Sequence, residues 1–218
     1  MPAIVDRNAK RADIVRHAAD VFARHGFHAT KMQDIATKAD IGKGTIYEYF
    51  RTKEELFLAI YDAWMGEFEH TISSRVSAAT DAMAKVDAIR ESAVEFYESR
   101  AEQAPLLLEF WAHALRTDNP AFLERVRRMR TYLRDLGAAL TRDLTSAGWF
   151  HEIDATAFAE LETGISDGIF LTWLMRGRDF PLAKAFTFRQ SVIGLGLLSA
   201  QGRAVVEDKL TSKLKRGF

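Results

Sequence analysis

Apolar residues recur at intervals of three and four positions along most of the chain, which is the spacing of amphipathic α-helices. No alternation of apolar and polar residues lasts more than a few positions, so the pattern predicts no strands. Capping residues and Pro mark the starts of the apolar stripes, and Gly marks several of their ends. The predicted helices cover residues 9–25, 31–39, 43–50, 53–77, 81–102, 105–115, 120–145, 154–176 and 181–201. The predicted fold class is therefore all-α.

Two short helices separated by a tight turn are predicted within residues 30–53. Thr30 and Gln33 have the spacing of a capping box, which opens a helix at the next residue. Asp40 tolerates the left-handed conformation that a tight turn between helices needs, and Gly42 can serve as the next N-cap. Two short helices around such a turn form a helix-turn-helix unit, whose second helix can lie in the major groove of DNA.

The second of these helices has an inward and an outward side. Ile46 and Phe50 are spaced to face the core, and a recognition helix of two turns must enter the groove by its N-terminal end. Cations beside the groove can bind phosphates, and we expect this of Arg7, Lys10 and Arg11 in the first helix as well. The residues expected to contact bases or phosphates are Thr30, Lys31, Lys43, Gly44, Thr45, Tyr47, Tyr49 and Lys53.

Residues 39–56, Ala-Asp-Ile-Gly-Lys-Gly-Thr-Ile-Tyr-Glu-Tyr-Phe-Arg-Thr-Lys-Glu-Glu-Leu, resemble the signature of the tetracycline-repressor (TetR) family of bacterial transcription regulators. The resemblance is strong over residues 12–58. Asp40 stands where Gly is common, and Gly42 stands where Ser or another capping residue is common. Gly42 lacks a side-chain cap, which lowers helix stability by only about a few tenths of a kcal/mol relative to Ser.

The resemblance implies an N-terminal three-helix helix-turn-helix DNA-binding domain, followed by a helical bundle for ligand binding and dimerisation. We place these domains at residues 1–53 and 54–218. In the family, a homodimer binds a palindromic operator in double-stranded DNA, usually as a repressor, and a small-molecule effector releases it. The family's layout also turns Gln33 toward the groove, so Gln33 joins the expected DNA contacts.

The charge distribution agrees with this division of the chain. The net charge is zero, but residues 1–53 hold 10 Lys and Arg against 6 Asp and Glu, and the remainder holds 20 against 24. A basic module on an acidic body suits DNA binding by the module alone.

The last two long predicted helices contain glycines in their interiors. Each such glycine lowers helix stability by about 1 kcal/mol relative to Ala, which is easiest to understand if another backbone packs close to it. Because both helices also carry more apolar surface than one face needs, we predict that two copies of the chain form a four-helix bundle here. The alternative is a hairpin that is fully buried within one chain. The predicted interface consists of Gly164, Ile165, Gly168, Ile169, Trp173, Gly194, Leu195 and Leu198.

The remaining chemistry is sparse. The effector is expected to be small and apolar or aromatic, with a candidate pocket formed by Trp64, Phe68, Phe96, Trp111 and Trp149, although each of these is more often ordinary core. No cofactor or metal is expected, and the absence of Cys excludes thiolate catalysis and Cys-ligated metals. The spacing Glu67-x-x-His70 suits a di-metal enzyme only with a second copy, which the sequence lacks.

Two alternative functions remain at this point, an enzyme in a helical bundle or a helical adaptor for a protein partner, and the DNA-binding consensus argues against both. Five arginines in residues 125–134 could bind an anion, but a solvated face is the favoured interpretation. The apolar runs are too short for a bilayer, and charge comes too early for a signal peptide. We therefore expect a cytoplasmic protein with no membrane partner.

Overall fold

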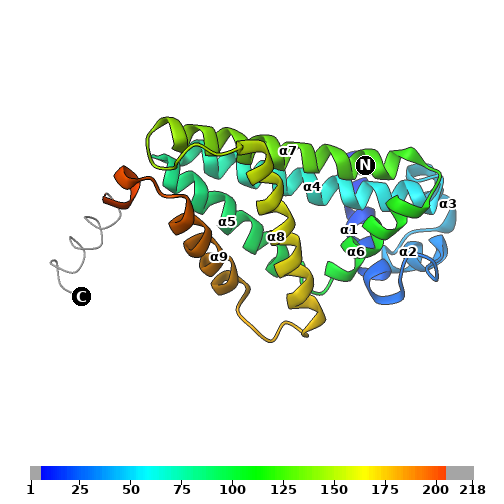
Figure 1. Cartoon of the computed structure of the whole chain (residues 1–218). Helices are drawn as coiled ribbons and strands as arrows, with labels where there is room; N and C mark the ends of the chain where they lie inside the picture. The colour runs from blue at the N-terminus through cyan, green and yellow to red at the C-terminus, as the bar shows by residue number, and fades with distance from the viewer. Residues whose placement is uncertain (1–5, 205–218) are drawn as a thin grey trace, which may run out of the picture. The chain divides into compact units, whose positions relative to one another are not determined.

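The computed structural model describes residues 6–204, and within them the chain forms nine α-helices and no strand longer than an isolated bridge (Figure 1). The helices are α1 (Arg7–His25), α2 (Met32–Lys38), α3 (Lys43–Tyr49), α4 (Lys53–Ala78), α5 (Ala82–Ser99), α6 (Ala104–Arg116), α7 (Pro120–Ser146), α8 (Ala155–Met175) and α9 (Leu182–Leu197). The all-α prediction is confirmed. A tail helix suggested by the spacing of Val206, Leu210 and Leu214 lies outside the described residues.

The chain divides into two compact units. The first consists of the residues up to His70 together with Ser99–Met129, and the second consists of Thr71–Glu98 and the residues from Arg130 onward. The first unit thus contains α1, α2, α3 and α6, and the second contains α8, α9 and all of α5 except its last residue, Ser99. Helices α4 and α7 contribute residues to both.

All nine predicted helices are present, and capping side chains explain several of their starts. Helix α1 begins at Arg7 because the Asp6 carboxylate accepts from the backbone N–H groups of Asn8 and Ala9. Asp154 caps α8 in the same way. Asp81, predicted as the first residue of α5, instead precedes it and accepts from the Ala84 N–H at 2.8 Å.

Helix α9 is shorter than predicted. It ends at Leu197 instead of Gln201, because the next residue leaves the helix and forms an antiparallel bridge with Phe150. The Ser199 N–H donates to the Trp149 carbonyl at 2.9 Å, and the His151 N–H donates to the Leu197 carbonyl at 3.1 Å. The loop after α7 therefore supplies hydrogen bonds that continued helix would have supplied, and a new helical segment begins at Ala200.

The first unit is built on a cluster of buried phenylalanines. Phe22 of α1 and Phe27, which follows it, both contact Phe57 of α4, with ring centroids 5.6 Å and 4.6 Å away. Phe57 also contacts Phe110 of α6 and Phe122 of α7, and all five rings are at most 2% exposed. Because each aromatic ring buries a large apolar area, this cluster fixes α1 and the segment after it against α4, α6 and α7.

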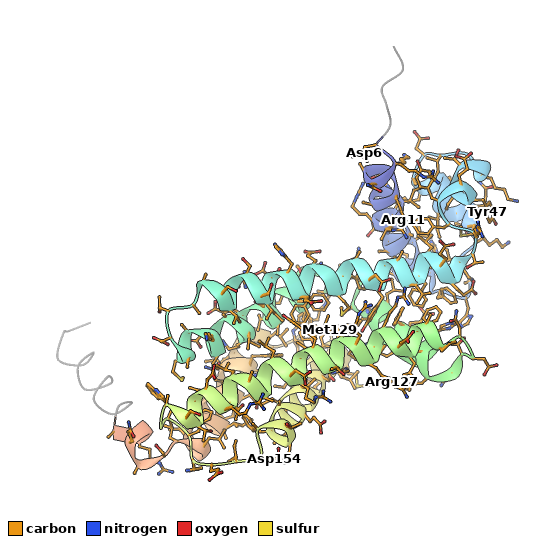
Figure 2. The ribbon with its side chains drawn as sticks, turned by 90° about the horizontal axis from the view of Figure 1, so that it is seen from above. Asp6, Arg11, Tyr47, Arg127, Met129 and Asp154 are labelled. Carbon is orange, nitrogen blue, oxygen red and sulfur yellow. The ribbon has the colours of Figure 1, made fainter. Side chains whose placement is uncertain are left out.

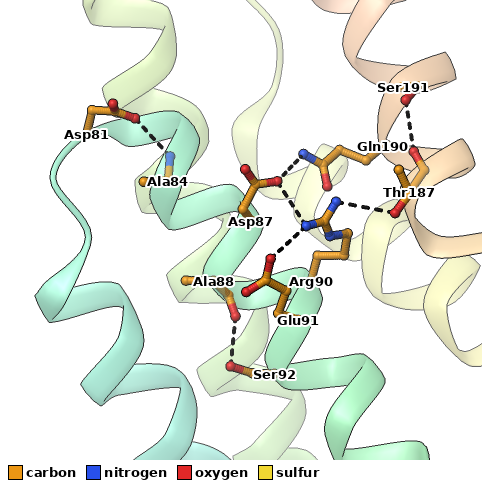
Figure 3. Close-up of polar contacts among 10 residues, drawn as sticks. All are labelled: Asp81, Ala84, Asp87, Ala88, Arg90, Glu91, Ser92, Thr187, Gln190 and Ser191. Carbon is orange, nitrogen blue, oxygen red and sulfur yellow. Dashed lines mark hydrogen bonds and ion pairs between the residues drawn. The ribbon is translucent and has the colours of Figure 1, made fainter. Parts of the chain in front are cut away.

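The second unit combines aromatic and polar contacts. Tyr97 of α5 stacks on Phe170 of α8 at 4.0 Å. Between α5 and α9 the contacts are polar: Gln190 donates to Asp87 at 3.0 Å, and Arg90 donates to the Thr187 hydroxyl at 3.3 Å (Figure 3). These bonds fix the side of α9 that faces α5 and leave another side of α9 uncovered by this chain.

Candidate nucleic-acid interface

Helices α2 and α3 form the expected helix-turn-helix unit. Asp40 has a φ of 50°, so it adopts the left-handed conformation that the sequence predicts for the turn. Gly42 is the N-cap of α3 and provides no side-chain hydrogen bond. Ile35 of α2 and Ile46 of α3 are completely buried, which fixes the inward sides of the two helices.

The start of α2 differs from the prediction. The helix begins at Met32, and the Asp34 carboxylate, not the Gln33 side chain, accepts from a backbone N–H, that of Lys31, at 2.8 Å. Thr30 is only 2% exposed, and its hydroxyl donates to the Gly26 carbonyl at 2.7 Å. The predicted capping box of Thr30 and Gln33 is therefore wrong, because α2 begins one residue later than predicted, with Lys31 as its N-cap and Asp34 at its third position.

The outward side of α3 agrees with the sequence pattern. Ile46 and Phe50 have no exposed surface, whereas Lys43 and Gly44 are exposed and Tyr47 is 43% exposed. Figure 2 shows the place of Tyr47 on α3. Thr45 and Tyr49 are half-buried, and Lys31 and Gln33 at the start of α2 are exposed. A methyl group on Gly44 would meet no atom within 4 Å. This side of α3 thus presents a cation, an open backbone and a phenol hydroxyl.

Two arginines of α1 hold the other end of α3. Arg7 donates to the Glu48 carbonyl at 3.4 Å and lies 5.7 Å from the ring centroid of Tyr49. Arg11 lies 4.6 Å from the ring centroid of Phe50. Both arginines were expected at phosphates, and their contacts at the end of α3 were not predicted. The only available signal was their four-residue spacing, which places them on one side of α1.

Lys53 was expected to bind a phosphate, but its ammonium has hydrogen-bond partners within the protein. It is half-buried at the start of α4, and its Nζ donates to the His28 carbonyl at 3.1 Å and to the Thr30 carbonyl at 3.0 Å. The sequence places Lys53 beside the module correctly, but it does not show that the ammonium is bonded to the module's own backbone.

The candidate pocket residues are distributed over both units. Trp64, Phe68 and Trp111 belong to the first unit, and Phe96 and Trp149 belong to the second. Trp64, Phe68 and Phe96 are at most 9% exposed, whereas Trp111 and Trp149 are half-buried. Their role as a pocket stays a prediction.

Helices α8 and α9 lie side by side and expose apolar surface (Figure 1). A methyl group on Gly164, Gly168, Gly194 or Gly196 would meet no atom within 4 Å, so none of these glycines packs closely against its own chain. The exposed large apolar residues of these helices are Leu161 (56%), Leu171 (36%), Met175 (77%), Phe188 (71%), Val192 (54%) and Leu195 (61%). This exposure contradicts the alternative of a fully buried hairpin.

Not all predicted interface residues share that exposed surface. Ile165 and Ile169 are half-buried, whereas Trp173 and Leu198 are 5% and 7% exposed and pack within their own chain. The Trp173 indole N–H donates to the Phe180 carbonyl at 3.1 Å, which fixes the turn between α8 and α9.

The arginines of α7 are largely paired with carboxylates. Arg125 and Arg128 both bond Asp62, Arg130 pairs with Asp167, and Arg134 pairs with Asp135. This supports the interpretation of a self-screened face over an anion site. Burial raises the pKa of the Asp167 carboxyl, and the neighbouring Arg130 acts in the opposite direction.

The part of the chain that the structure describes contains neither a candidate metal site nor a helix that could span a membrane. Residues 6–204 contain no group of three or more His, Asp or Glu that could hold a metal ion. Glu67, part of the Glu-x-x-His spacing, forms an ion pair with Arg100. None of the described helices is long and apolar enough to cross a bilayer.

Comparison with known proteins identifies two matching families. Residues 14–60 match the family described as bacterial regulatory proteins, tetR family, and residues 82–190 match the BetI-type transcriptional repressor, C-terminal family. The fatty acid metabolism regulator protein of Bacillus subtilis is 24% identical over 178 residues, which cover 81% of this chain and 89% of the relative. The transcriptional activator FasR of Mycolicibacterium smegmatis is 27% identical over 103 residues, 47% of each chain.

Solved structures share the fold. A TetR transcription regulator from Haloarcula marismortui has a TM-score of 0.79 at 21% identity and covers 88% of this chain and 100% of its own. The fatty acid degradation regulator FadR from Bacillus halodurans has a TM-score of 0.72 at 23% identity, with 85% and 94% covered. FadR from Bacillus subtilis, in complex with stearoyl-CoA, has a TM-score of 0.74 at 20% identity, with 85% and 98% covered. These relatives are transcription regulators, not enzymes.

Proposed function

The chain belongs to the TetR family of bacterial transcription regulators. We propose that it is a repressor that binds a palindromic operator as a homodimer, and that an effector releases it from the operator. Residues 1–53 form the DNA-binding domain in this proposal, and residues 54–218 bind the effector and dimerise. The observation that carries the proposal is the outward side of α3, which is polar and open over two completely buried core residues.

The proposed contacts follow from the order of residues along α3. Lys43, Gly44 and Thr45 lie at its N-terminal end, which enters the groove first. A lysine ammonium can donate to guanine O6 and N7, and a threonine methyl can contact the thymine methyl. The absence of a side chain at Gly44 lets the backbone approach the base edges. Tyr47 places its hydroxyl further along the same side, within reach of a phosphate or a base edge.

The proposed dimer uses the uncovered sides of α8 and α9. Exposed leucines, valine and phenylalanine beside unobstructed glycines are suited to close helix packing, and large exposed apolar patches are unusual on monomers. A twofold axis brings the same surface of both copies together. It also fixes the distance between the two recognition helices, so that half-sites must be separated by one helical turn of DNA or a multiple.

The proposed effector is a long-chain acyl-CoA. A relative that matches 81% of this chain is named a fatty acid metabolism regulator, and the Bacillus subtilis FadR structure contains stearoyl-CoA. A fatty acyl chain is apolar, as is the effector that the sequence predicts. The effector must bind the DNA-free geometry more tightly than the DNA-bound geometry, since only differential affinity shifts the equilibrium. Choline, bound by a similar regulator from Saccharomonospora viridis, is the rival.

In-vitro selection from random duplex DNA, without effector and at two salt concentrations, tests the proposal. We expect an enriched palindrome whose affinity falls steeply with salt, because phosphate contacts release counterions. Stearoyl-CoA should then release the selected duplex, and choline at equal concentration should not. Enrichment of a non-palindromic sequence, or of none at either salt concentration, contradicts an unliganded dimeric operator binder.

A further inference from the structure

The Lys53 side chain folds back onto the connector between α1 and α2, residues 26–31. Its ammonium lies 3.1 Å from the His28 carbonyl oxygen, 3.0 Å from the Thr30 carbonyl oxygen and 4.6 Å from the ring centroid of Phe27. One ammonium therefore bonds two carbonyls of the connector and covers its buried aromatic ring. The bond to Thr30 is partly buried, which makes it expensive to leave unmade.

The connector is held from a second side by α6. Both Glu109 carboxylate oxygens lie 3.0 Å from the backbone nitrogen of Phe27, whose ring is only 2% exposed. The Thr30 hydroxyl adds a bond to the Gly26 carbonyl at 2.7 Å. The path of the connector is thus determined by α4 and α6 together, and the connector in turn sets where α2 begins.

We propose that Lys53 is a positioning residue for DNA reading and not a phosphate contact. Two of the three donors of the ammonium are used by the His28 and Thr30 carbonyls. Moving the ammonium to a phosphate would leave both carbonyls without this partner. By holding the connector, Lys53 fixes the N-terminal end of α2, where exposed Lys31 and Gln33 are presented. The inference rests on the proposed DNA binding, although the contact itself is also measurable in the free protein.

Lys31 provides a matched control for the experiment. It is exposed, makes no side-chain cap bond, and is another lysine that the sequence predicts at a phosphate. Lys31→Met and Lys53→Met each remove one positive charge, and the methionine at position 53 keeps an unbranched stem near the Phe27 ring. The measurements are the Tm of each protein, and the salt dependence of Kd for the selected operator and for a duplex with one changed base pair per half-site.

We expect Lys53→Met to lower the Tm, to reduce the ratio of operator to changed-duplex affinity by roughly tenfold, and to leave the slope of log K against log salt unchanged. Lys31→Met should keep the Tm and the ratio, and lower the slope by about one. A slope reduced by about one in Lys53→Met, with its ratio retained, would overturn the inference. A lower Tm with a wild-type ratio in the folded protein would also overturn it, since the role would then be structural only.

Lys53→Arg keeps the charge and serves if Lys53→Met does not fold. A guanidinium spreads its donors over a planar fork, so it does not replace one ammonium between two carbonyls but binds phosphate well. We expect a reduced affinity ratio here too, and a wild-type Tm and ratio would refute the positioning role. If the wild-type protein retains no DNA, the proposed function fails, and equal Tm values for the Lys31 and Lys53 variants would separately refute the contact.

Discussion

Gly44→Ala should stabilise the free protein and weaken its DNA binding. Gly44 lies in the first turn of α3, has no positive φ, and leaves a new methyl group free of neighbours within 4 Å. Replacing such a helical glycine by alanine stabilises by about 0.5–1 kcal/mol, largely by restricting the unfolded chain. In the complex, the same methyl occupies space that the proposal gives to base edges. We expect a loss comparable to one base contact, about 1–3 kcal/mol per half-site.

Gly66→Ala is the matched control for Gly44→Ala. Gly66 lies within α4, is exposed, and also has no atom within 4 Å of an added methyl group. Both variants should raise the Tm in thermal unfolding. Only Gly44→Ala should weaken binding of the selected operator in a fluorescence anisotropy titration. An operator affinity of Gly44→Ala equal to that of the wild type would refute close approach of the α3 backbone to DNA. Equal losses of operator affinity in both variants would show that the loss does not arise in the groove.

Three further predictions concern the dimer, a helix cap and pH. Leu195→Glu should give a monomer at micromolar concentration by light scattering, whereas Leu115→Glu on α6, where the leucine is even more exposed, should stay dimeric. The same oligomeric state for both variants would contradict the proposed interface. Asp154→Ala should lower the unfolding free energy by about 1 kcal/mol, with Asp154→Asn largely retaining it, because the α8 cap is lost. Burial is the main cause that lowers the pKa of His113 below 6.5, and the charge of His28 acts in the same direction. The unfolded state therefore binds more protons, and the protein loses stability as the pH falls below about 6.5. His113→Phe should flatten Tm between pH 5 and 7, and an unchanged slope would contradict this.

The sequence predicts the helices well because their signals are local. The left-handed turn at Asp40 and the inward positions of Ile46 and Phe50 follow from residue type and spacing, and all three are confirmed. The exceptions are the exact start of one helix and an end that depends on partners distant in sequence. Helix α2 begins one residue later than predicted, and α9 ends early because the loop at Phe150 supplies other hydrogen bonds. Periodicity contains no information about such partners.

The same limit applies to the charged residues of the DNA-binding module. Lys31 and Lys53 look alike in sequence, since both are lysines at the start of a helix in a basic module. Only the fold shows that one ammonium is exposed and that the other bonds carbonyls 23 and 25 residues earlier in the chain. Arg7 and Arg11 likewise lie over the rings of Tyr49 and Phe50 at the end of α3, partners that their four-residue spacing does not identify.

The helical glycines give the dimer and DNA proposals a common physical basis. A glycine in a helix interior lowers stability by about 1 kcal/mol relative to alanine, and within a chain the usual compensation is close packing against another backbone. Gly44, Gly164 and Gly168 receive no such compensation from their own chain. What distinguishes them from Gly66 is their surroundings, because Gly44 adjoins exposed Lys43 and Tyr47, and the other two lie among exposed apolar residues of α8. The two proposed partners, DNA for Gly44 and a second copy for the glycines of α8, would account for glycines that the isolated fold does not require.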